Sequence, residues 1–190
     1  MHRVYFISHP EVVIDPIVPV PQWSLSEVGK SRMSRLANTT WMREVEAVWS
    51  STERKAMDCA AILGSALSLA PQSHEELGEN DRTATGYLEK LEFENAADEF
   101  FANPAISIRG WERAIDAQSR ICRGVEFVLA RSTGARAIAL CAHGGVGALY
   151  LCKLKGVPIS RAEDQPSGRG NYYAFEVPGG LVHGWRPIDE

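Results

Sequence analysis

YFISHP, residues 5–10, begins with three apolar residues and then turns polar at Ser8 and His9. A second stretch, RAIALCAHGG at residues 136–145, has the same form and ends on His143 followed by two glycines. Short runs that are apolar on both faces are typical of strands buried inside a sheet. Ligands of open α/β sheets bind beyond the carboxyl ends of the strands, so both histidines lie where we expect a functional site.

Strand-like and helix-like segments alternate along the rest of the chain. Further strand-like runs cover residues 45–51 and 172–177, and helical patterns cover residues 24–37, 52–68 and 107–130. Ser26 stands where it can cap the first of these helices. This alternation predicts an α/β fold, a three-layer sandwich in which helices flank a mainly parallel central sheet.

The last strand-like segment differs from the others. Residues 171–188 form two extended runs around Pro178, Gly179 and Gly180, which predicts an antiparallel hairpin at or near an edge of the sheet. The chain of 190 residues contains no internal repeat and no linker that would divide it. We therefore expect one domain over residues 1–190, in which residues 80–110 form a cap or insertion near the site.

The composition is that of an ordinary globular protein, with 45% hydrophobic and 23% charged residues. A formal net charge of −4 provides no general basic field, so we expect neither nucleic acid nor an anionic membrane surface as a partner. No apolar run approaches the roughly 20 residues that span a bilayer, and the first residues do not resemble a signal peptide, so we expect a cytoplasmic protein. The four cysteines have no metal-site spacing and lie in apolar surroundings, so we expect small buried side chains and no metal: Cys59, Cys122, Cys141 and Cys152.

Two further segments supply polar groups near the expected site. SSTERKA, residues 50–56, places Arg54 and Lys55 in the first turn of a predicted helix, where a positive charge is unfavourable unless an anion lies nearby. The loop HEELGENDRTATG contributes a carboxylate at Glu79. Gly144 opens the helix after the second histidine, and a helix start offers unpaired N–H groups to an anion. Each residue alone would be an ordinary loop or surface residue, but together they favour an anion-binding site.

The order of these motifs resembles that of the histidine phosphatase superfamily, with its phosphoglycerate-mutase-like fold, over nearly the whole chain. The matching segments are the strand-end histidine, LSEVGKSR, SSTERKAMDCA, LGE and AHGG. The resemblance implies that His9 is a nucleophile phosphorylated during turnover, that His143 is the second histidine of the pocket, and that Glu79 is the acid. It also implies that no metal or cofactor is required. Phosphate would be bound by residues of the same motifs: Ser8, Arg54, Lys55 and Gly144.

This sequence departs from the family pattern where phosphate should be bound most strongly. Ser8 and Pro10 give Ser-His-Pro in place of the family's Arg-His-Gly, as in a divergent subgroup, and Lys55 stands in place of an arginine. Lysine keeps a positive charge but lacks the bidentate fork of arginine, and serine keeps only a hydroxyl. Three arginines in loops near the strand ends are candidates to replace the lost cation: Arg54, Arg82 and Arg169.

These residues leave two classes of function. The first is a phosphatase that hydrolyses a phosphate monoester of a small metabolite, or a phosphoprotein, through phospho-His9. The second is a weakened or inactive relative that binds a phosphorylated ligand or partner. A phosphoglycerate mutase is less expected because that activity calls for a strongly cationic pocket. The acidic residues within 86–110 would disfavour highly charged substrates such as polyphosphates.

Overall fold

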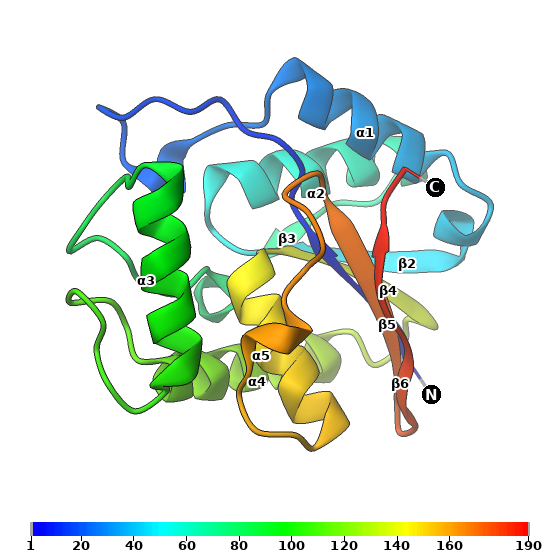
Figure 1. Cartoon of the computed structure of the whole chain (residues 1–190). Helices are drawn as coiled ribbons and strands as arrows, with labels where there is room; N and C mark the ends of the chain where they lie inside the picture. The colour runs from blue at the N-terminus through cyan, green and yellow to red at the C-terminus, as the bar shows by residue number, and fades with distance from the viewer. Residues whose placement is uncertain (1, 190) are drawn as a thin grey trace.

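The computed structural model describes residues 2–189 and contains a six-stranded sheet with the strand order β3-β2-β4-β1-β5-β6 (Figure 1). The first four strands of this order pair in parallel, whereas β5 lies antiparallel to β1 and β6 antiparallel to β5. This confirms the mainly parallel sheet and the C-terminal hairpin, with β6 at one edge. The strands are β1 (His2–Ser8), β2 (Val45–Ser50), β3 (Gln72–Ser73), β4 (Ala137–Ala142), β5 (Asn171–Val177) and β6 (Gly180–Pro187).

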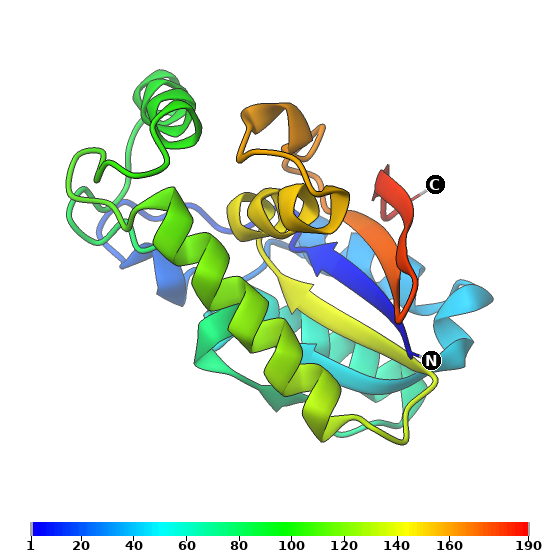
Figure 2. The same ribbon diagram turned by 90° about the horizontal axis from the view of Figure 1, so that it is seen from below.

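Helices cover both faces of the sheet, as the alternating sequence pattern predicts (Figure 2). Side chains of β1 alternate between the two faces: Val4 and Phe6 belong to one buried apolar cluster, and Tyr5 and Ile7 to the other. The first cluster includes residues of α4 and α5, and the second includes residues of α1 and α2. The helices are α1 (Glu27–Ala37), α2 (Arg54–Leu67), α3 (Lys90–Ala102), α4 (Ala114–Arg131) and α5 (Gly144–Lys155).

The ends of two helices show how local chemistry sets the boundaries. Ser26 caps α1, because its hydroxyl oxygen accepts the backbone N–H of Gly29 at 3.1 Å. The helix predicted from residue 107 instead begins at Ala114, so this boundary was wrong. Arg109 and Gly110 have φ angles of 50° and 82°, which a right-handed helix does not allow. A turn therefore separates α4 from the preceding segment.

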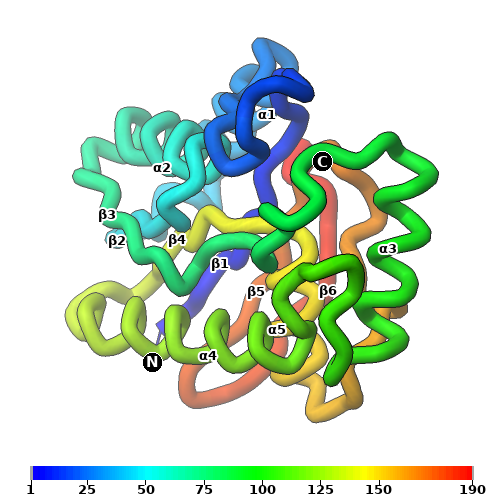
Figure 3. Tube along the Cα trace, turned by 90° about the vertical axis from the view of Figure 1, so that its left-hand side faces the viewer, coloured from blue at the N-terminus to red at the C-terminus, as the bar shows by residue number. Residues whose placement is uncertain are grey.

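Residues 80–110 contain a helix, α3, that the sequence pattern did not predict. Figure 3 shows α3 and its flanking loops beside α5, with α2 and β3 at the opposite side of the view. This segment also meets the proline-rich loop after β1, because the rings of Trp23 and Tyr87 lie with their centroids 5.7 Å apart. Among residues 2–189, no helix is both long enough and apolar enough to cross a membrane.

Candidate active site

The two strand-end histidines lie together because β1 and β4 are parallel neighbours in the sheet. Ser8 pairs with Ala142 in the register, so the next residue on each strand is a histidine. The backbone N–H of His9 donates to the Ala142 carbonyl at 3.3 Å. The ring centroids of His9 and His143 are 5.4 Å apart, with an interplanar angle of 71°. The sheet thus brings the two histidines to one place, as the sequence indicated.

His9 is partly exposed and has one ring nitrogen fixed by the backbone. Its Nδ1 lies 2.9 Å from the carbonyl oxygen of Pro10. A carbonyl can only accept, so Nδ1 carries the proton and Nε2 keeps its lone pair. Burial, with a smaller contribution from the Lys55 ammonium, lowers the pKa of His9 to about 4. The side chain is therefore neutral at physiological pH and presents a nucleophilic nitrogen.

His143 is the residue that precedes α5, and it is fully buried. Its Nε2 lies 2.7 Å from the Ser51 hydroxyl oxygen and 3.4 Å from Oε1 of Glu53. Burial lowers the pKa of His143 to about 4, with the carboxylates of Glu53 and Glu79 acting in the opposite direction. Its Nδ1 is buried and has no hydrogen-bond partner among the described residues. Such a nitrogen is expected to meet a polar ligand atom.

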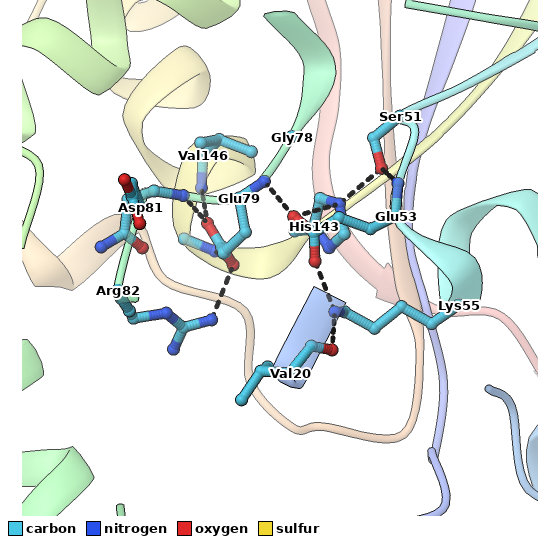
Figure 4. A network of polar contacts seen from close by, with 12 residues as sticks. Val20, Ser51, Glu53, Lys55, Gly78, Glu79, Asp81, Arg82, His143 and Val146 are labelled. Carbon is cyan, nitrogen blue, oxygen red and sulfur yellow. Dashed lines mark hydrogen bonds and ion pairs between the residues drawn. The ribbon is translucent and has the colours of Figure 1, made fainter. Parts of the chain in front are cut away.

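The carboxylate of Glu79 lies at the amino terminus of α5 (Figure 4). It accepts the backbone N–H of Gly145 at 3.1 Å and that of Val146 at 2.9 Å, and these are groups that we expected an anion to use. Gly144 precedes these two residues at the helix start, and the side-chain amide of Gln165 leaves no room for a side chain at this position. The helix start therefore holds an anion that belongs to the protein itself.

Arg120, which the sequence analysis missed, holds the loop that carries Glu79. Its guanidinium donates to the backbone carbonyls of Glu76, Gly78 and Glu79 at 2.9 to 3.0 Å. The same group forms two hydrogen bonds with the carboxylate of Glu112, at 2.8 and 3.0 Å. Arg120 lies on α4, about forty residues along the chain from the loop, so no local pattern indicates this contact.

Lys55 contributes a buried ammonium on the other side of the two histidines. Its side chain is 3% exposed, and Nζ donates to Oε2 of Glu53 at 2.5 Å and to the carbonyl of Val20 at 3.0 Å. The other carboxylate oxygen of Glu53 accepts the backbone N–H of Glu79 at 2.8 Å. Burial opposes ionisation of Glu53, but His143 and the Lys55 ammonium outweigh it and hold its pKa well below the usual range. Glu53 thus provides an anion beside the cations of this helix start, and the sequence analysis did not single it out.

Ser8 and two of the three candidate arginines point elsewhere. The Ser8 hydroxyl lies 2.5 Å from the Gln165 side-chain oxygen and accepts the backbone N–H of Asn171 at 3.0 Å. Arg54 is 61% exposed and pairs with Asp58 at 2.8 Å. Arg169 is exposed and forms no hydrogen bond or ion pair with another of the described residues. None of the three contacts His9 or His143.

Arg82 is the candidate arginine that reaches a site residue (Figure 4). Its Nη2 lies 3.9 Å from Oε2 of Glu79. The guanidinium carbon lies 5.0 Å from the Phe93 ring centroid and 5.6 Å from that of Trp111, within the range of cation–π attraction. The positive charge is also close enough to contribute to the lowered pKa of His9. The segment around α3 therefore supplies a positioned cation to the site.

The site contains no arrangement suited to a metal. Across residues 2–189, no three His, Cys, Asp or Glu side chains are grouped so that they could hold an ion. All four cysteines are free thiols, three of them buried and Cys122 partly buried. The groups that converge on the site are two neutral histidines, two cations and two carboxylates.

Comparisons with known proteins agree with this fold. The family model of the histidine phosphatase superfamily, branch 1, matches residues 18–181. Bacillus stearothermophilus YhfR has a similar structure, with a TM-score of 0.79, 23% sequence identity, and coverage of 97% of this chain and 95% of that one. A mycobacterial glucosyl-3-phosphoglycerate phosphatase gives a TM-score of 0.75 at 19% identity, covering 98% of this chain and 96% of that one. A candidate alpha-ribazole-5'-P phosphatase from Escherichia coli gives 0.76 at 18% identity, covering 99% and 98%. A search of curated protein sequences found no match. Identities this low establish a shared fold.

Proposed function

The chain belongs to the histidine phosphatase superfamily, and we propose that it is a phosphatase that hydrolyses a phosphate monoester through a phosphohistidine at His9. The observation that carries the proposal is the pairing of the two histidines. His9 has a free ring nitrogen in the neutral state, and 5.4 Å away His143 has a buried Nδ1 without a partner. The first is suited to attack phosphorus, and the second to donate to a phosphoryl oxygen.

In the first proposed step, Nε2 of His9 attacks the phosphorus atom, a P–N bond forms and the bond from phosphorus to the ester oxygen breaks. A proton that a monoanionic ester brings into the site passes through the Glu79 carboxylate to the departing oxygen, which leaves as an alcohol. The Ser51 hydroxyl oxygen accepts the backbone N–H of Glu53 at 3.2 Å. The hydroxyl can therefore donate its own hydrogen bond to Nε2 of His143. The proton of His143 then sits on Nδ1, where it can donate to the phosphoryl group.

In the second proposed step, water attacks the phosphorus of the phosphohistidine and the P–N bond breaks. The Glu79 carboxylate takes a proton from this water and passes it to the phosphate that forms. Inorganic phosphate leaves, and His9 returns to its neutral form. The two steps need only side chains of this chain and one water molecule.

We further propose that Arg82 replaces the cation lost at Ser8. It is the candidate arginine in contact with a site residue, and Phe93 and Trp111 hold its guanidinium in place. A hydrogen bond to a charged group contributes about 1.5–3 kcal/mol, so Arg82→Met should lower kcat/KM by about tenfold or more. Matched changes at Arg54 and Arg169, which lie outside these contacts, should leave it within about twofold. Equal kinetics for all three variants would contradict the proposal.

We also propose that residues 80–110 form a cap that helps to select the substrate. This segment supplies Arg82, and Tyr87 joins it to the loop after β1 through Trp23. Its helix carries several acidic residues, including Glu92 and Glu99. A negative field of this kind favours a singly phosphorylated small metabolite or a phosphoprotein over a polyphosphate. Faster hydrolysis of an inositol polyphosphate than of its monophosphate would contradict this selectivity.

The direct test is turnover of p-nitrophenyl phosphate and a panel of small phosphate monoesters and phosphopeptides between pH 5 and 8. The native chain should turn over at least one ester, and His9→Ala should not. His183→Ala is the matched control because this histidine lies on β6, bonded to the Gly184 carbonyl, and should retain activity. Alkaline quenching during turnover should trap a phosphoprotein only when His9 is present, because the P–N bond of a phosphohistidine is stable to base and labile to acid. No turnover by folded protein on any ester would instead indicate a relative that only binds phosphorylated ligands.

A further inference from the structure

Glu53 is a largely buried carboxylate in the middle of the candidate site, and the position of its side chain is not explained by its own helix. Glu53 is the residue that precedes α2, yet its side chain makes no capping hydrogen bond to that helix. Instead, Oε2 contacts the Lys55 ammonium at 2.5 Å. Oε1 accepts the backbone N–H of Glu79 at 2.8 Å and lies 3.4 Å from Nε2 of His143. The carboxylate thus points away from the helix start and across the site (Figure 4).

The groups that Glu53 contacts are the ones that a phosphoryl group needs. An ammonium and a backbone N–H, here those of Lys55 and Glu79, are typical partners of phosphoryl oxygens. Lys55 is also the residue that stands in place of the family's arginine, so it is the cation expected to bind phosphate. With Glu53 present, this cation is already paired before any ligand arrives.

The charges of the site support the same conclusion. Lys55 faces Glu53, Arg82 faces Glu79, and both histidines are neutral, so the positive and negative charges balance. A phosphate dianion entering this site adds two negative charges next to a carboxylate that is 13% exposed and poorly screened by water. Binding the dianion is therefore favourable only if Glu53 withdraws from its contacts.

We propose that Glu53 is a built-in competitor of the phosphoryl group, which occupies the anion-binding donors of the empty site and sets the affinity for substrate and product. The inference rests on the proposed function for the identity of the ligand, but it concerns binding and not the chemical step. Phosphate bound to Lys55 and to the backbone N–H of Glu79 displaces the Glu53 carboxylate from them. Because inorganic phosphate must do the same, the contact also weakens retention of the product.

The test uses sulfate, a tetrahedral dianion whose charge does not change between pH 5 and 9. Its binding to the native chain and to Glu53→Gln is measured by isothermal titration calorimetry at pH 7 and constant ionic strength. The amide oxygen can accept from only one of Lys55 and the N–H of Glu79, and the side chain carries no charge, so sulfate should bind about tenfold more tightly or better. The matched control is Glu75→Gln, an exposed carboxylate in the adjacent loop, which should change the affinity less than about twofold.

The outcomes separate this inference from the phosphatase proposal. Sulfate binding by Glu53→Gln that is unchanged, weaker or absent, in protein with a native circular dichroism spectrum, would overturn the role of Glu53. If that variant fails to fold, Glu53→Ala replaces it, and stronger product inhibition by inorganic phosphate is a second expected result. Tighter sulfate binding without His9-dependent turnover would retain the role of Glu53 and remove the phosphatase. His9-dependent turnover without tighter sulfate binding would retain the phosphatase proposal and remove the role of Glu53.

Discussion

Replacing Arg120 with lysine should loosen the loop that carries Glu79 and lower both stability and activity. The arginine makes five hydrogen bonds, three to backbone carbonyls and two to the carboxylate of Glu112. An ammonium cannot span these acceptors and can keep about two of the five bonds. Each lost bond to a charged group contributes about 1.5–3 kcal/mol. Because the side chain is 19% exposed, water replaces part of the loss, and we expect the free energy of unfolding to fall by about 2–4 kcal/mol.

Urea unfolding followed by circular dichroism measures this change, and steady-state kinetics measure its effect on the site. A domain of ordinary stability, about 5–15 kcal/mol, remains folded after such a loss, so kcat can be determined. Displacing Glu79 by a fraction of an ångström should lower kcat by about tenfold or more, with a smaller change in KM. Arg123→Lys on the same helix is the control, because Arg123 is 58% exposed and pairs only with a carboxylate, so its loss should be below about 1 kcal/mol. A stability loss below about 1 kcal/mol and an unchanged kcat for Arg120→Lys would refute the reasoning.

Three further predictions concern the histidine pair and its surroundings. The pKa of His143 is about 4 in the folded chain and about 6.5 when unfolded, so the unfolded chain takes up the proton first as the pH falls. His143 should therefore contribute a decrease of about 2 kcal/mol in the free energy of unfolding between pH 6.5 and 4.5, and urea titrations of His143→Gln, which keeps the similar contribution of His9, should show a flatter pH dependence. Gly145→Ala places a methyl group 2.7 Å from Oε1 of Glu79, so kcat should fall about tenfold or more, whereas Gly184→Ala, with open space around it, should not change kcat. Ser8→Ala should lower the free energy of unfolding by about 1–2 kcal/mol, because the hydroxyl pairs with a β5 backbone N–H, with kcat within about threefold of native. A much larger loss of kcat than of stability would show that this hydroxyl acts on the substrate.

The sequence was most informative where the site depends on strand ends. Two apolar runs that each end in a histidine predict buried parallel strands, and neighbouring parallel strands must end at the same edge. This is why the positions of His9 and His143 could be predicted. Lys55 could also be placed, because it lies in the first turn of a helix that follows a third strand. Each of these positions follows from a local pattern and the topology of the sheet.

The parts that could not be predicted depend on contacts between distant segments. Arg120 lies on α4, and only the packing of that helix against the loop at residues 75–79 makes its guanidinium a support for Glu79. From the sequence, Glu53 is a carboxylate at the start of a helix, and such a residue would ordinarily cap its own helix. Its contact with the N–H of Glu79 joins residues that are 26 positions apart. Local periodicity carries no information about such pairings, and for the same reason Arg82 could not be separated from Arg54 and Arg169.

The departures from the family pattern and the presence of Glu53 have one physical basis, because a buried cation at this site needs a counter-ion. Ser8 is fully buried among Gln165 and Asn171, where no carboxylate pairs with it, so an arginine there would lack a counter-ion in the empty protein. Lys55 is nearly as buried but has Glu53, and a buried ammonium without such a partner would be strongly destabilising. Glu53 therefore stabilises the empty site by the same contact through which it competes with phosphate. Its removal should weaken the fold and tighten anion binding at once. A carboxylate with a purely structural role would produce the first effect without the second.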